Sequence, residues 1–98
     1  MDNRVAVISI IVENEDAVEA LNGVLHQYGE YIIGRLGIPY RAKGINIICV
    51  ALDAPGDTIN ALTGALGRIP GINAKATLLQ RLIDNRPTLT SPDAENTL

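Results

Sequence analysis

Aromatic side chains are scarce in this sequence: three tyrosines make up 3% of the 98 residues, and tryptophan and phenylalanine are absent. A single cysteine excludes a disulfide within the chain, so nothing requires an oxidising compartment. Because aromatic residues are so few, aliphatic residues must form the core. The abundant Val and Ile favour strands, because branching at Cβ suits a pleated surface. The length predicts one domain with a modest core, for which self-association is a natural way to bury more surface.

Basic residues are also few, with 8 Lys and Arg against 11 Asp and Glu, for a net charge of −3. They are scattered, whereas nucleic-acid binding needs clustered positive charge, so we expect no direct contact with DNA or RNA. No apolar run approaches the roughly 20 residues of a membrane-spanning helix. The chain opens on a strand-like run without the segment order of a secretory signal, which predicts a cytoplasmic protein.

Short β-branched runs alternate with segments of helical periodicity along most of the chain. The runs predict strands because they are short, rich in Val and Ile, and bounded by turn residues. The helical segments carry apolar residues at spacings of three and four, begin at Asn14 or near Pro55, and end at glycines such as Gly29. The expected order is strand 4–12, helix 14–29, strand 31–39, strand 45–52, helix 53–69 and strand 72–78.

This order is the βαββαβ unit of ferredoxin-like folds. The predicted fold is α+β, a four-stranded antiparallel sheet of order 4-1-3-2 with two helices on one face. The first and third runs are the most apolar and suit central strands, whereas Gly34, Gly37 and Pro39 place the second run at an edge. We predict a ferredoxin-like domain over 1–79, then a polar, flexible tail over 80–98 with too little apolar surface to fold.

The helix-free face of the predicted sheet is apolar where an exposed face should be polar. In the first strand, Val5, Val7 and Ile11 alternate with an equally apolar set, and the third strand repeats this pattern around Cys49. Both faces of the sheet should therefore be buried. We expect a second copy of the chain to cover the helix-free face in a dimer or tetramer. The alternative is that the tail folds back across it.

Two glycines within the second strand mark the most unusual segment, Gly34-Arg35-Leu36-Gly37. Glycine inside a strand indicates a bulge or a close backbone approach, by a ligand or a second subunit. Regular alternation with Ile32 and Leu36 directs Arg35 to the helix-free face, where it could pair with a carboxylate. We interpret the segment as tight pairing between subunits, with binding of a small anion or amino acid as the alternative. Gly34, Arg35 and Gly37 are accordingly candidate ligand-binding residues.

Motifs for catalysis and metal binding are missing. The sequence has no nucleophile–base–acid arrangement, phosphate loop or dinucleotide fingerprint, and Glu13, Glu15 and Asp16 are most simply charges at a helix start. His26 and Cys49 are two soft ligands where zinc usually takes four, unless a symmetric interface doubles them. Cys49 suits a buried small side chain, and His26 a solvent-facing one. We predict no enzymatic activity, no cofactor and no metal site.

Two segments, HQYGEYIIGRLGIPY at 26–40 and LGRIPG at 66–71, resemble the small regulators of the iron-only hydrogenase system. The resemblance extends from Arg4 to Leu78 and excludes the segment from Gln80 onward. That family is related to ACT domains and to the regulatory domain of the nickel-responsive repressor. The resemblance therefore implies a ferredoxin-like oligomer with a regulatory role.

The related families differ in what they bind. ACT relatives bind amino acids or other small ligands near subunit interfaces, and Asn14 lies where they place part of their ligand loop, so it joins the candidate ligand-binding residues. The nickel-repressor relatives bind metal through His and Cys at a tetramer interface, beside a DNA-binding module that is not found in this sequence.

Two functional hypotheses follow. The first is an oligomeric regulatory or sensor domain that binds a small ligand or a protein partner and regulates transcription or maturation linked to iron-only hydrogenase. The second is a non-catalytic structural or assembly protein that binds only other proteins, with the polar tail as an interaction segment.

Overall fold

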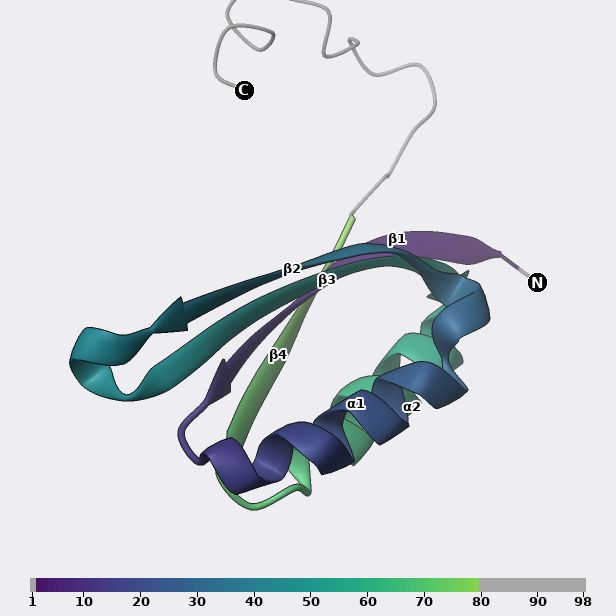
Figure 1. The fold of residues 1–98 in the computed structure, drawn as a ribbon. Helices are drawn as coiled ribbons and strands as arrows, with labels where there is room; N and C mark the ends of the chain where they lie inside the picture. Colours follow the sequence, from purple (N-terminus) through teal and green to yellow (C-terminus); the bar gives the residue numbers. More distant parts are fainter. Residues whose placement is uncertain (1, 80–98) are drawn as a thin grey trace, which may run out of the picture.

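The computed structural model describes residues 2–79, which form one antiparallel sheet with two helices on one of its faces (Figure 1). The strands are β1 (Asn3–Val12), β2 (Ile32–Tyr40), β3 (Ile45–Pro55) and β4 (Ile72–Leu78), and the helices are α1 (Val18–Gln27) and α2 (Gly56–Gly67). The strand order β2-β3-β1-β4 is the predicted 4-1-3-2 order seen from the other edge. The predicted ferredoxin-like α+β fold is therefore confirmed.

The hydrophobic core lies between the sheet and the helix layer. Alternate residues of the central strands point toward the helices and have no exposed surface, as Ile8 of β1 and Val50 of β3 show. Leu21 of α1 and Leu62 of α2 close the core from the other side and are also fully buried. Burying one such side chain contributes about 1.5–3 kcal/mol. No polar or charged side chain of residues 2–79 is buried, so apolar packing holds the layers together.

The connection from β1 to α1 is held by short polar contacts. Asn14 caps a 3₁₀ turn (Glu15–Ala17) that leads directly into α1, and its side-chain oxygen accepts a hydrogen bond from the Asp16 backbone N–H at 2.9 Å. This confirms Asn14 as the predicted cap. The Glu13 N–H donates to the Gly71 carbonyl at 2.8 Å, which ties this connection to the turn before β4.

Two predicted helix boundaries are wrong. The first helix was predicted to end at Gly29, but α1 ends at Gln27 and Gly29 begins a 3₁₀ turn (Gly29–Tyr31), in which the Tyr31 N–H donates to the Tyr28 carbonyl at 3.0 Å. Among the described glycines only Gly44 and Gly71 have positive φ. The segment 53–55, predicted as a helix start, belongs to β3 because residues 3–5 of β1 pair with it.

The described chain remains attached to the sheet at its end. The Leu79 N–H donates to the Val5 carbonyl at 2.8 Å, and the Arg4 guanidinium donates to the Leu79 carbonyl at 3.2 Å. The predicted polar tail over 80–98 lies outside the described residues.

Candidate functional site

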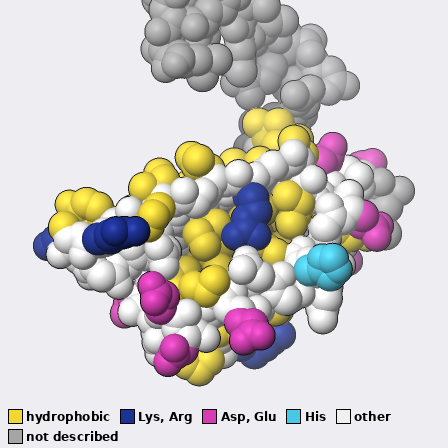
Figure 2. All heavy atoms as spheres, viewed as in Figure 1, with side chains coloured by type: hydrophobic (Ala, Val, Ile, Leu, Met, Phe, Trp, Pro, Cys, Tyr) yellow, Lys and Arg dark blue, Asp and Glu magenta, His cyan; other side chains and the backbone are white. Residues whose placement is uncertain are grey.

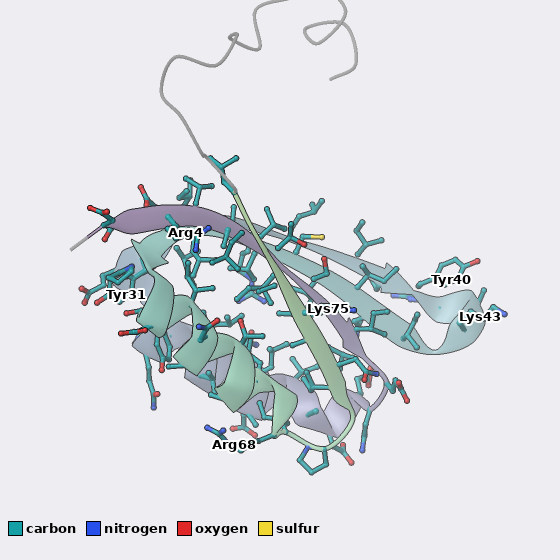
Figure 3. The ribbon with its side chains drawn as sticks, turned by 180° about the vertical axis from the view of Figure 1, so that it is seen from behind. Arg4, Tyr31, Tyr40, Lys43, Arg68 and Lys75 are labelled. Atoms are coloured by element: carbon teal, nitrogen blue, oxygen red, sulfur yellow. The ribbon has the colours of Figure 1, made fainter. Side chains whose placement is uncertain are left out.

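Within residues 2–79, no helix covers the sheet face that points away from α1 and α2, where Figure 3 shows side chains standing off the strands. Exposed aliphatic residues alternate here with the buried ones of the core, as predicted. The exposed fractions are 41% for Val5 and Val7, 42% for Ile11, and 46–59% for the three large apolar side chains of β2 on this face. We call the following set the apolar patch: Val5, Val7 and Ile11 of β1, Leu36, Ile38 and Tyr40 of β2, and Ile45, Ile47, Cys49 and Ala51 of β3.

The apolar patch stops at β4. On the helix-free face this strand presents Asn73, Lys75 and Thr77, all exposed. Thr77 pairs directly with Val7, and Lys75 pairs with Ser9. The β4 side of the face is therefore polar over residues 73–77, and the exposed Leu79 beyond the end of β4 lies beside Val5.

The turn between β2 and β3 adds a shallow hollow at one end of the patch. Tyr40 and Lys43 lie together at this tip (Figure 3), and Ile11 and Glu13 line the opposite side. The Glu13 carboxylate already accepts a hydrogen bond from the Asn73 side chain at 2.7 Å. The hollow thus offers apolar walls, the Lys43 ammonium group and the Glu13 carboxylate.

Arg35 lies on the helix side of the sheet, so its predicted direction is wrong. It pairs with Val50, whose side chain is buried beneath the helices, and its guanidinium donates to the Asn22 side-chain oxygen of α1 at 3.1 Å. Every residue of β2 after Ile32 is exposed. Figure 2 accordingly shows hydrophobic and basic side chains at the surface between the β2–β3 hairpin and the helices. The Arg35 side chain therefore reaches from β2 to α1 across this exposed region.

A β-bulge explains the reversal. Ile32 pairs with Leu52 and Gly34 with Ala51, so Ile33 is an extra residue with no partner of its own. Because side chains alternate with a period of two, one extra residue exchanges the faces of everything after it. Ile32 therefore joins the core side, while Leu36 lies on the helix-free face.

The two glycines of β2 lie on opposite faces as well. Gly34 is level with Ala51, on the helix-free side, and Gly37 with Ile48, on the helix side. A Cβ built at either position meets no atom within 4 Å. The predicted bulge is thus present beside Gly34, and no close backbone approach within the described residues requires either glycine.

Asn14 lies apart from the other candidate residues. Strand pairing places Gly37 level with Ile10 of β1 and Gly34 level with Val7. Asn14 is four to seven residues further along the chain, or about 13–23 Å at about 3.3 Å per residue. The structure does not bring Asn14 together with Gly34, Arg35 and Gly37, and their role in ligand binding stays a prediction.

His26 and Cys49 lie on opposite sides of the molecule. His26 is exposed on α1, and Cys49 is only half-buried on the helix-free face, level with Ser9 of β1 and Leu36 of β2. Within residues 2–79, His, Cys, Asp and Glu side chains form no group of three or more that could hold a metal ion. In the same range, neither helix is long and apolar enough to cross a bilayer.

Comparison with known proteins gives the family. Residues 4–76 match the model of the TM1266-like family, described as "Iron-only hydrogenase system regulator, putative". The chain belongs to this family. Its structure is similar to that of protein TM1266 from Thermotoga maritima, with 36% sequence identity and a TM-score of 0.77 over 81% of this chain and 100% of that chain. The family resemblance seen in the sequence is thereby confirmed.

More distant structures share the fold alone. A formyltetrahydrofolate deformylase from Pseudomonas putida KT2440 is 15% identical, with a TM-score of 0.54 over 74% of this chain and 28% of that chain. An unknown protein from Galdieria sulphuraria is also 15% identical, with a TM-score of 0.56 over 85% of this chain and 49% of that chain. No curated protein matches the chain.

Proposed function

We propose that this protein is a cytoplasmic, homo-oligomeric regulatory domain of the iron-only hydrogenase system. In this proposal the helix-free face joins copies of the chain, and the assembly binds a small ligand or a protein partner. The observation that carries the proposal is the apolar patch on a chain of the TM1266-like family.

Burial of the apolar patch provides the driving force for assembly. Val7 of β1 and Leu36 of β2 leave 41% and 59% of their surface in water. In β1 the residues that alternate with Val7 are buried in the core, whereas β2 is exposed on both faces after Ile32. Removing apolar surface from water contributes about 25 cal/mol per Å². The same face of a second copy would cover these exposed side chains, so no further helix or strand is needed.

The regulatory part of the proposal rests on family membership. The chain has a net negative charge, and we expect any step on DNA or on hydrogenase maturation to be carried by a partner protein. The regulator would then act by changing its affinity for that partner when a ligand binds.

Native mass spectrometry of the untagged full chain purified from cells tests the assembly and its ligand together. We expect a dimer or tetramer of the 10.4 kDa chain, with additional mass from a bound molecule. An oligomer without additional mass would favour a protein partner over a small ligand. A monomer at all concentrations would contradict the proposal.

The link to hydrogenase is tested in the source organism by deleting the gene. We expect the hydrogenase transcript, or the active hydrogenase it yields, to change in amount and to return on complementation with the wild-type chain. Unchanged levels of both across growth with and without hydrogen production would contradict a regulatory role in this system.

A further inference from the structure

The apolar patch has a defined centre. It is three strands wide, and β3 is the middle strand, with β1 on one side and β2 on the other. Along β3, Cys49 lies midway between Ile45 at the hairpin end and Asp53 at the other end. Across the strands it is level with Ser9 and Leu36. The only cysteine of the chain therefore marks the middle of the patch.

The patch supplies, in projection, about half of the area that a standard subunit interface buries on each partner. With strands about 4.8 Å apart and about 3.3 Å per residue, it measures about 14 Å by 30 Å, or about 400 Å² in projection. The accessible surface of protruding side chains exceeds this projection, and a standard interface buries about 800 Å² per partner. The largest apolar patch of a soluble monomer is typically about 300–600 Å² and often functional, so the size marks this patch as a candidate binding surface.

The chemistry of the patch favours a second copy as its occupant. No member of the patch is charged, and the charged residues of this face, such as Lys75 and Asp53, lie at its borders. Two such patches can pack against each other without burying like charges in the interior of the interface. Shallow relief also suits two sheets, which pack face to face about 10 Å apart.

We infer that two copies pack sheet to sheet about a two-fold axis that passes close to Cys49, an inference that rests on the proposed function. When one surface pairs with itself, the axis runs through the middle of that surface, and residues at the axis meet their own counterparts. This holds whether the strands of the two sheets run parallel, antiparallel or crossed. The two Cys49 thiols therefore face each other across the interface, while β4 with Lys75 and Thr77 lies at the rim.

Cross-linking through the native cysteine tests the position of the axis. The full chain is treated with diamide, a small oxidant that is reduced as two adjacent thiols form a disulfide, and is examined by non-reducing denaturing mass spectrometry, with its assembly state measured in parallel by light scattering. We expect Cys49 to yield covalent dimers about tenfold faster than a distant cysteine, because the second reaction is then intramolecular. The yield should be independent of total protein concentration once the chain is assembled.

Relocated cysteines provide the matched controls. In a Cys49→Ser background, Ala61→Cys places the thiol on the exposed side of α2, and Thr77→Cys places it on β4 on the same face as the patch. We expect the cysteine at position 61 to form covalent dimers only through random collisions, and the cysteine at position 77 to give a lower dimer yield than Cys49. An assembled wild-type chain whose Cys49 links no faster than the position-61 control would overturn the axis but leave the proposed assembly intact. A monomeric wild-type chain would overturn both.

Discussion

Single residues fix the junction where β1, α1 and β4 meet. Gly71 has φ +85°, and a Cβ built there would lie 2.8 Å from the Asn14 Cβ. Its carbonyl also accepts the Glu13 N–H. Both the backbone conformation and the space at this position therefore require glycine.

Replacement of Gly71 tests this junction. We expect Gly71→Ala to lower the free energy of unfolding by about 1–3 kcal/mol, because alanine is strained at this φ and collides with Asn14. Urea denaturation at one fixed protein concentration measures the change. Gly23→Ala is the control, since a Cβ there meets nothing within 4 Å and alanine favours the α1 helix. Equal destabilisation by both substitutions would contradict the account.

At the scale of elements, local sequence patterns correctly predicted those features that neighbouring residues determine. The bounds of β4 and the cap at Asn14 follow from short-range alternation and side-chain chemistry, and both are found as predicted. The direction of Arg35 was missed because one extra residue, Ile33, reverses the alternation of β2. The neighbouring Gly34 was the only signal of that bulge, and it did not reveal the register.

Long-range pairing explains why the start of the second helix was predicted too early in the sequence. The segment 53–55 carries proline and an acidic residue, which are common at a helix start. It is nevertheless strand because residues 3–5 of β1 lie beside it and satisfy its backbone. A partner that is distant in the sequence overrode the local preference, and no local pattern contained that information.

The start of the first helical segment offers a test at this scale. We expect Asn14→Ala to lower the free energy of unfolding by about 1 kcal/mol, because the Asp16 N–H loses its acceptor. Asn14→Ser should restore most of the loss, since serine caps equally well. Urea denaturation of the three proteins checks this order, and no difference between alanine and serine would contradict a capping role.

At the scale of the whole molecule, the sheet has two apolar faces and only one helix layer. The sequence predicted this imbalance because both sets of alternating residues in β1 and β3 are apolar. The structure shows that the imbalance ends at the polar strand β4. It also shows that the β2–β3 hairpin is left open on its helix side, where Arg35 reaches Asn22. The polar limit at β4 follows from the alternation of Asn73, Lys75 and Thr77 with apolar residues in the sequence. The open hairpin did not follow from sequence, because it depends on the register of β2.

The most direct test of the account compares two neighbours that lie on either side of this polar border. Val7 and Thr77 pair across β1 and β4 on the same face, and both are exposed. Light scattering on the full chain, with circular dichroism to confirm folding, measures the mass of Val7→Lys and Thr77→Lys beside the wild type. We predict that the wild type is oligomeric, that Val7→Lys dissociates to folded monomers because an ammonium group cannot be buried unpaired in the patch, and that Thr77→Lys stays assembled. A wild-type monomer, or a Val7→Lys protein that is folded and assembled like the wild type, would contradict burial of the apolar patch by a second copy.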